Sequence, residues 1–177
     1  MLQTAPRNNF IDEYIFGKME RDGIPYAGLC TDEEFIRRVY LDLTGRIPAA
    51  EIVRSFVSDS NPAKRDMLVD TLIGTPPYVD RWTIWLSDFF RNTIYPGSAE
   101  GRNAFYFQIR RWVQDNTPYN QIAQELITAA GDSFSNGPLN YLMKAGIAGD
   151  YEQNDTLDDM AVAVTRNFLG VKILCIS

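Results

Sequence analysis

Two aspartates stand beside arginines inside apolar helical segments, where a carboxylate could act as an acid or a base. Asp42 lies in the run Arg37-Arg38-Val39-Tyr40-Leu41-Asp42-Leu43-Thr44-Gly45, and Asp88 lies between Arg81-Trp82 and Arg91. The functional interpretation is a cleft in which an arginine orients an aspartate base. The structural interpretation is a set of ion pairs that tie helix faces together. Because a neighbouring arginine lowers the pKa of an aspartate and makes it a poor base, the structural interpretation is favoured.

An enzyme that hydrolyses a polysaccharide or a related polymer is the alternative that these aspartates allow. Asp42 or Asp88 would be the acid/base, and the tryptophans Trp82, Trp85 and Trp112 would form a platform for sugar rings. Such an enzyme needs two carboxylates about 5–9 Å apart in a cleft. Aromatic residues at helical spacing more often belong to a hydrophobic core, which is the preferred interpretation of this stripe.

Cysteine offers a second kind of chemistry. The chain has two cysteines, Cys30 and Cys175, and no histidine. Cys175-Ile176-Ser177 supplies the first three positions of Cys-x-x-Cys-His, which attaches haem through two thioethers and an axial histidine. We therefore treat Cys175 as the first cysteine of a truncated haem motif; the alternative is a small buried hydrophobic residue. Without histidine, we expect no catalytic residues, metal or cofactor in this chain, and haem c only in the full-length protein.

One loop resembles a calcium-binding loop at its start. The segment from Asp132 to Gly137 begins with the appropriate aspartate. However, Phe134 occupies a ligand position, and Met143 stands where the closing glutamate belongs. We therefore predict no calcium site here.

The bulk properties of the chain exclude several classes of partner. Its 177 residues carry a net charge of −6, which argues against nucleic acid and anionic membrane surfaces as partners. No apolar run reaches the length of a membrane span. Residues 1–9 lack the apolar core of a signal peptide.

Helical periodicity recurs along nearly the whole chain, whereas strand alternation is almost absent. A first helix is expected over 10–21, and Thr31-Asp32-Glu33-Glu34 reads as a capping box for a second helix that Gly45 ends. The last helix should be capped by Thr156 and closed by Gly170.

This pattern predicts an all-α fold, a single orthogonally packed multi-helix domain with eight or nine helices. Residues 1–177 are expected to form one helical domain, a fragment of a longer multidomain protein. Leu43 and Trp85 are assigned to its core.

Several of these motifs together resemble a known bacterial domain of unknown function. The most specific is Tyr40-Leu41-Asp42-Leu43-Thr44-Gly45; Arg81-Trp82 through Asp88, and Asn167-Phe168-Leu169-Gly170-Val171 leading to Cys175, are similar as well. The chain thus resembles the planctomycete cytochrome-c-associated domain of the PSCyt-two type. The resemblance implies a multidomain, extracytoplasmic (periplasmic or exported) protein with cytochrome-like haem modules. In that family, a segment like 168–175 usually leads straight into Cys-x-x-Cys-His.

The resemblance implies a non-catalytic helical accessory or interaction domain of an exported, cytochrome-c-type haem-associated protein. Its partners would be other domains of the same protein or a cytochrome-like partner. The hydrolase described above is the alternative. A third hypothesis is a protein-binding helical module without a cofactor, which would show an exposed apolar patch.

Overall fold

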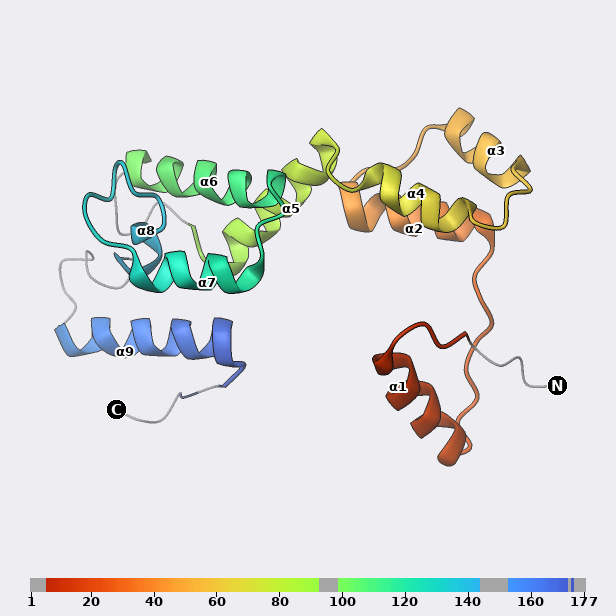
Figure 1. Cartoon of the computed structure of the whole chain (residues 1–177), viewed down its shortest axis with the longest axis horizontal. Helices are drawn as coiled ribbons and strands as arrows, with labels where there is room; N and C mark the ends of the chain where they lie inside the picture. Colours follow the sequence, from red (N-terminus) through yellow and green to blue (C-terminus); the bar gives the residue numbers. More distant parts are fainter. Residues whose placement is uncertain (1–5, 93–98, 144–152, 172, 174–177) are drawn as a thin grey trace.

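The computed structural model describes residues 6–92, 99–143, 153–171 and 173, and this part of the chain is helical without strands. It confirms the all-α fold predicted from the periodicity (Figure 1). The α-helices of the described part are α1 (Phe10–Arg21), α2 (Asp32–Thr44), α3 (Ala50–Ser58), α4 (Lys64–Leu72), α5 (Pro76–Phe89), α6 (Ala99–Gln114), α7 (Tyr119–Thr128), α8 (Leu139–Leu142) and α9 (Gln153–Val164). A π-helical turn, η2 (Thr165–Leu169), follows α9. None of these helices is long and apolar enough to cross a membrane.

Helix α5 joins two groups of helices. It packs against α2 on one side and against α6 on the other. Helices α3 and α4 both pack on α2, while α8 contacts α6 and α7 (Figure 1). Helix α1 lies apart from both groups at the end of an extended linker. The molecule is therefore elongated, and α5 is its central connection.

The second helix begins and ends as the sequence predicts. The Thr31 hydroxyl accepts a hydrogen bond from the Glu34 backbone amide, and the Glu34 carboxylate accepts one from the Thr31 amide. At the other end, Gly45 adopts the left-handed conformation with φ of +68°. A Cβ at this position would lie 3.2 Å from Cδ of Arg81. The glycine thus ends α2 and also lets the arginine stem of α5 pack closely over that end.

Ionic contacts around Asp32 connect the start of α2 to α4. Lys64 Nζ and Arg65 Nη2 each lie 2.6 Å from an Asp32 carboxylate oxygen. Arg65 also donates to the Cys30 carbonyl at 2.8 Å, and Lys64 donates to the Phe56 carbonyl at 3.0 Å. Asp32 therefore connects α2 to α4, while Arg65 adds the linker and Lys64 adds α3 to the network.

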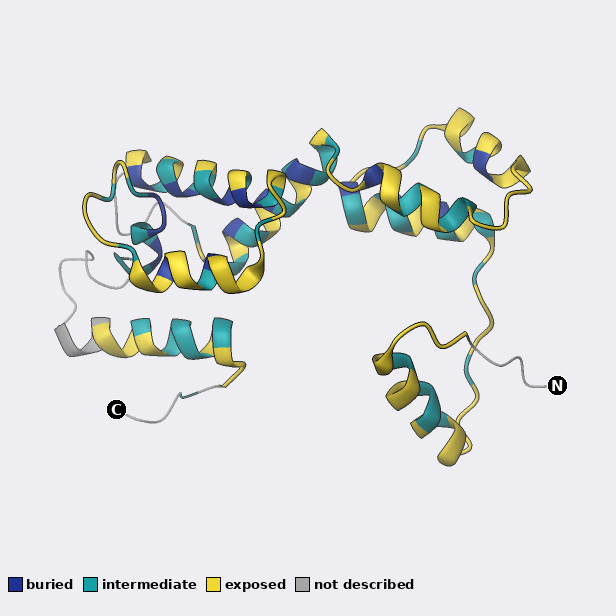
Figure 2. Ribbon diagram, viewed as in Figure 1, coloured by how far each residue is buried: buried dark blue, intermediate teal, exposed yellow. Residues whose placement is uncertain are grey.

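The main hydrophobic core lies among α5, α6, α7 and α8. Figure 2 shows buried residues concentrated on the facing sides of these helices. The buried members of this core are Phe90, Phe105, Ile109, Trp112, Ile122, Leu126 and Tyr141. The helices that lie outside it are amphipathic or largely exposed, and α1 has no buried residue at all.

Two core assignments made from the periodicity need correction. Trp85 is 44% exposed, although its ring stacks on that of Phe89 at 5.4 Å between centroids. Leu43 is only half-buried.

The start of the last helix also differs from the prediction. Thr156 does not cap this helix, because α9 already begins at Gln153. Gly170 does close it, with φ of +66°, but after a π-helical turn that the sequence pattern did not predict.

The burial pattern predicts a clear order of truncation effects. Ile109→Ala should reduce the free energy of unfolding by about 2–5 kcal/mol, because this fully buried side chain leaves a cavity. Trp85→Ala should cost less, since almost half of the indole is already in water. Urea denaturation followed by circular dichroism measures both values. A larger cost for Trp85→Ala would contradict the placement of α5.

The Asp32 network predicts a pH-dependent part of the stability. Hydrogen bonds from Lys64 and then from Arg65 lower the pKa of the Asp32 carboxyl from its usual 3.8. A lowered folded-state pKa contributes stability that is present above the unfolded pKa and is lost as the pH falls through the folded-state pKa. Asp32→Asn should therefore be less stable than wild type at neutral pH, with the difference shrinking on acidification below about pH 4. Denaturation series across pH would show this, and a pH-independent difference would oppose it.

Candidate functional site

The feature that organises the C-terminal half is a cluster of aromatic rings around Phe90. This residue directly follows the last turn of α5, and its side chain is fully buried. Its ring centroid lies 6.4 Å from that of Phe105, 6.5 Å from Trp112, 5.7 Å from Tyr141 and 6.5 Å from Phe168. One side chain thus contacts rings from α6, α8 and η2 at distances that favour aromatic pairs.

The two residues after Phe90 end α5 and connect it to α6. Arg91 has φ of +53°, a left-handed conformation that is uncommon for residues other than glycine and stops the helix. The Asn92 backbone amide donates to the Ser87 carbonyl at 2.7 Å, and its side chain donates to the Arg102 carbonyl at 3.1 Å. The first bond caps the end of α5, and the second connects that end to α6.

Asn167 and Phe168 attach the end of α9 to this cluster. Tyr119 Oη donates to the Asn167 carbonyl at 2.8 Å, and Asn167 Nδ2 donates to Tyr141 Oη at 3.0 Å. The Phe168 ring centroid lies 5.9 Å from the rings of both Tyr119 and Tyr141. We refer to these two residues and the two tyrosines as the tyrosine anchor. It holds η2 against α7 and α8 by a combination of hydrogen bonds and ring packing.

The π-helical turn accounts for how both residues reach the anchor. In η2 the helix widens, and the backbone amides of Gly170 and Val171 both donate to the Thr165 carbonyl. Such single turns change the direction of the following side chains and are frequent at functional sites. The anchored segment is followed directly by the residues that lead toward Cys175.

The tyrosines of the anchor serve as neutral hydrogen-bonding groups. Burial raises the pKa of the Tyr141 hydroxyl, and the hydrogen bond from Asn167 offsets only part of this effect. Burial also raises the pKa of Tyr119. Both hydroxyls therefore stay protonated well above neutral pH, so Tyr119 keeps its bond to the Asn167 carbonyl. This arrangement can position a segment of chain, but it does not activate a nucleophile.

The structure does not bring Asp42 and Asp88 into a paired site. Both side chains are exposed, and neither forms an ion pair within the described part of the chain. The prediction that these aspartates tie helices together by ion pairs is therefore wrong. The ion pairs that do so are the Asp32 network and the contact between Asp80 of α5 and Arg110 of α6 at 2.6 Å. Sequence reasoning missed these pairs because their partners are about 30 residues apart.

The calcium-like loop has a purely structural explanation. The two carboxylate oxygens of Asp132 accept hydrogen bonds from the backbone amides of Phe134 and Ser135, at 3.3 and 3.1 Å. The buried Gly137 packs against the Ala104 carbonyl of α6, where a Cβ would come within 2.5 Å. Asp132 thus closes a tight turn that seats this loop on α6.

The cysteines do not complete a haem site within this chain. Cys175 lies outside the described residues. Cys30 is a half-buried free cysteine in the linker before α2, and Arg65 of α4 binds its carbonyl. The sequence has no histidine to act as an axial ligand, and the described residues contain no metal-binding group of three or more acidic or cysteine side chains. The residues present therefore do not fit a complete haem c attachment site.

Comparison with known proteins identifies a family. The model of PSCyt2, described as a protein of unknown function (DUF1549), matches residues 10–177. The match covers α1 through the residues that follow η2, so it includes the Thr44-Gly45 helix stop and the tyrosine anchor. No curated protein and no solved structure gave a significant match to the chain.

The anchor predicts different effects for two neighbouring residues. Phe168→Ala should lower the free energy of unfolding by roughly 2–4 kcal/mol, because three ring contacts are lost. Leu169→Ala is the matched control and should change it by no more than about 0.5 kcal/mol, since Leu169 is 68% exposed. Equal costs in chemical denaturation would mean that η2 is not held by Phe168.

Proposed function

This chain belongs to the PSCyt2 family, and we propose that it is a non-catalytic helical accessory domain of an exported, cytochrome-c-type haem-associated protein. In this proposal the domain contributes structure: it fixes the segment that leads to Cys175 and presents a surface to the haem module. Its partners are other domains of the same protein or a cytochrome-like chain.

The observation that carries the proposal is the tyrosine anchor. Two hydrogen bonds and three aromatic contacts hold Asn167 and Phe168, although these residues belong to the last described helical turn. Anchoring at this point reduces the conformational freedom of the residues that follow, which favours a defined position for a module attached there.

The surface next to the anchor also supports a contact with another module. Leu169 is 68% exposed and Val171 is 50% exposed, immediately after the anchored pair. Tyr119, whose hydroxyl holds the anchor, is itself 45% exposed. These apolar side chains lie where the chain leaves the core, so a module positioned there would remove them from water.

Haem would be attached to Cys175, together with a second cysteine and a histidine that this chain lacks. Cys175 would be the first of two thioether cysteines, and a further part of the protein would supply the second cysteine and the axial histidine. The extracytoplasmic location belongs to the same proposal, because covalent haem attachment of this type takes place there in the family that the chain resembles. Asp42 and Asp88 are both exposed, and neither lines the pocket between α3 and α4, so neither adds support to the hydrolase alternative.

The proposal predicts covalent haem in the full-length gene product. We would express that protein with the periplasmic haem-attachment machinery and record its absorption spectrum before and after denaturation. We expect a Soret band and sharp reduced α and β bands that persist when the protein is unfolded. A folded but colourless protein would contradict the haem association and leave an interaction module without a cofactor.

Two cysteine variants make this experiment specific. Cys175→Ala should remove one thioether and strongly reduce the haem that survives denaturation. Cys30→Ala is the matched control and should leave the spectrum unchanged, because Cys30 lies in the linker beside α4. Equal spectra for wild type and Cys175→Ala would exclude Cys175 from haem attachment.

A further inference from the structure

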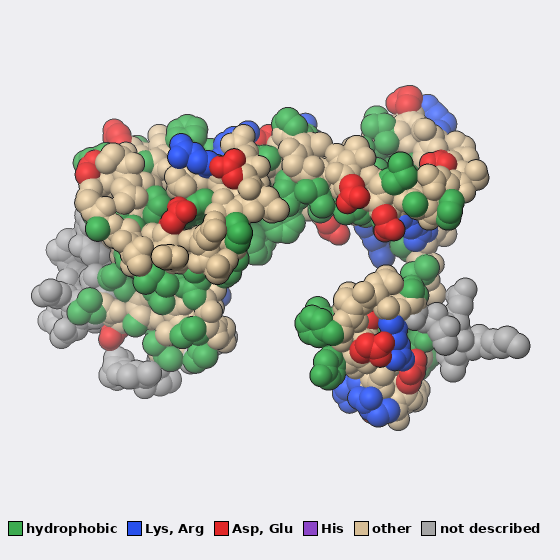
Figure 3. Space-filling model, viewed as in Figure 1, with side chains coloured by type: hydrophobic (Ala, Val, Ile, Leu, Met, Phe, Trp, Pro, Cys, Tyr) green, Lys and Arg blue, Asp and Glu red, His purple; other side chains and the backbone are tan. Residues whose placement is uncertain are grey.

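The loop between α7 and α8 contains the one asparagine–glycine pair in the sequence, Asn136-Gly137. Glycine has no side chain that shields its amide nitrogen or restricts the backbone. The nitrogen of such a pair can therefore attack the asparagine carboxamide without an enzyme. The loop runs along the outer edge of the group that contains α6 and α7 (Figure 1), where Figure 3 shows mainly backbone and polar side chains. Asp132 and Ser135 of this loop are exposed, so water reaches the segment around the pair.

The folded loop holds Asn136 by its backbone and by its side chain. The Asn136 amide donates to the Asp132 carbonyl at 2.8 Å, and the Asn136 carbonyl accepts from the Leu139 amide at 3.2 Å. The side-chain nitrogen Nδ2 donates to the Ala130 carbonyl at 2.8 Å. Two consecutive turns thus meet at Asn136, and rotation of its peptide group would disrupt both of them.

Gly137 is fixed as firmly as its neighbour. It is buried, and a Cβ at this position would lie 2.5 Å from the Ala104 carbonyl oxygen of α6. Its carbonyl accepts hydrogen bonds from the backbone amide and from Nδ2 of Asn140, both at 3.0 Å. The Gly137 nitrogen therefore cannot move toward the Asn136 side chain unless this part of the loop leaves α6. The same packing accounts for the residue types, because glycine alone fits against α6 and the Asn136 amide supplies the donor for Ala130.

We propose that Asn136 is a site of spontaneous deamidation, that the folded loop suppresses the reaction, and that the modified loop loosens α8 and the tyrosine anchor. The site would thus set a chemical lifetime for the anchored segment. This inference concerns residues of this chain alone and does not depend on haem.

The reaction needs only water and solvent base. The Gly137 nitrogen loses its proton to base and forms a bond to Cγ of Asn136. The bond from Cγ to Nδ2 breaks, and the nitrogen leaves as ammonia with a proton from water. Water then adds to either carbonyl carbon of the cyclic imide, and ring opening gives aspartate or isoaspartate. The net change consumes one water, releases one ammonia and oxidises or reduces no atom.

The hydrogen bonds of the loop oppose the first step. Ring closure brings the Gly137 nitrogen to Cγ, so it requires rotation about the Cα–C bond of Asn136 and a near-attack geometry that the native turns do not allow. It also requires Nδ2 to leave the Ala130 carbonyl. The reaction therefore proceeds from molecules in which the loop has opened locally, and its rate follows the population of that open state.

Both products fit the loop less well than asparagine does. Each places a carboxylate where Nδ2 donated to the Ala130 carbonyl, so two acceptors face each other without a donor. The Asp132 carboxylate, which closes the preceding turn, adds a second negative charge to the same short loop. Isoaspartate also inserts Cβ into the main chain and shifts Gly137 from its contact with α6.

Helix α8 connects this loop to the tyrosine anchor. The helix has only four residues, and its first amide, that of Leu139, bonds back to the Asn136 carbonyl. Tyr141 of α8 accepts the hydrogen bond from Asn167, and its ring centroid lies 5.7 Å from that of Phe90. Loss of the turn at Asn136 therefore loosens α8 and one side of the anchor.

Peptide mapping by mass spectrometry tests the site and its suppression. The 177-residue chain would be incubated at mildly alkaline pH, either folded or unfolded in urea, and sampled over time. We expect Asn136 to deamidate in urea and to react at least roughly tenfold more slowly in the folded chain. Absence of conversion in urea would overturn the site, and equal rates in the two states would overturn the suppression.

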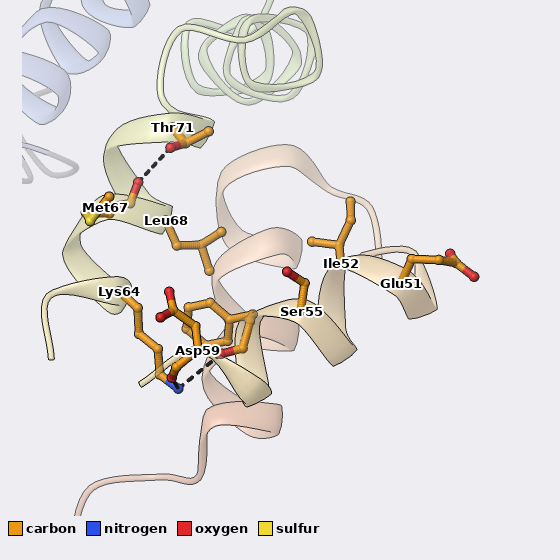
Figure 4. A pocket seen from close by; sticks show the side chains of 9 residues that line it. Glu51, Ile52, Ser55, Asp59, Lys64, Met67, Leu68 and Thr71 are labelled. Atoms are coloured by element: carbon orange, nitrogen blue, oxygen red, sulfur yellow. Dashed lines mark hydrogen bonds between the residues drawn. The ribbon is translucent and has the colours of Figure 1, made fainter. Parts of the chain in front are cut away.

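A loop variant that leaves the reactive pair intact makes the comparison specific. Asp132→Ala removes the hydrogen bonds from the Phe134 and Ser135 amides and should speed deamidation of the folded chain roughly fivefold. Asp59→Ala is the matched control, because Asp59 accepts from the Asn61 amide at 2.8 Å in the same kind of turn, between α3 and α4 (Figure 4). The control should react like wild type, and all three chains should react equally in urea. Equal rates for both folded variants would overturn the role of the loop.

Hydrogen exchange of a product mimic tests the effect on the anchor. Asn136→Asp should make the amides of residues 139–141 and 165–171 exchange roughly five- to tenfold faster. Asn120→Asp is the matched control and should leave this protection unchanged, since Asn120 is exposed in the first turn of α7, where a carboxylate is favourable. Unchanged protection in Asn136→Asp would overturn the claim that deamidation loosens the anchor.

Discussion

The burial of the Phe90 ring is the contact on which the C-terminal half of the structure depends. Phe90 directly follows α5, the helix that joins the two groups, and it meets rings from α6, α8 and η2. The next residue, Arg91, adopts the left-handed conformation, which ends the helix. Because aromatic pairs of this kind add to the hydrophobic gain from burial, the same residue sets where α5 ends and where η2 lies.

This constraint connects the fold to the proposed function. Phe168 contacts Phe90 and both tyrosines of the anchor, while the backbone and side chain of Asn167 each form a hydrogen bond to one tyrosine. Residues 167 and 168, which precede the segment toward Cys175, are thus held in place by contacts with Phe90 and the two tyrosines. Thr44-Gly45, which the family match also covers, lies against the first half of α5, where Gly45 admits the side chain of Arg81. Both motifs therefore contact α5, one in its first half through Arg81 and one through Phe90 just after its last residue.

The parts of the fold that were predictable from sequence are those set by local chemistry. The Thr31 capping box and the glycine stop at Gly45 each depend on residues within one or two turns, so spacing alone identifies them. The exposure of Trp85 was not predictable, because periodicity shows that a helix has an apolar face but not how much of that face its neighbours cover. The Asp32 network and the tyrosine anchor join residues 26 or more positions apart, and the π-helical turn has no local sequence signal of its own. The family resemblance pointed to residues 167–171, but only the structure supplied a physical role for them.

Hydrogen exchange of a Phe90→Leu variant tests the central claim most directly, because leucine keeps the site apolar but removes the ring contacts. Mass spectrometry of peptides from wild type and variant would compare the protection of backbone amides along the chain. If Phe90 holds the anchor, amides of residues 165–171 will exchange faster together with those of α8, while those of α2, α3 and α4 will keep their protection. Unchanged protection of residues 165–171 would contradict the claim that the Phe90 cluster positions the segment leading to Cys175.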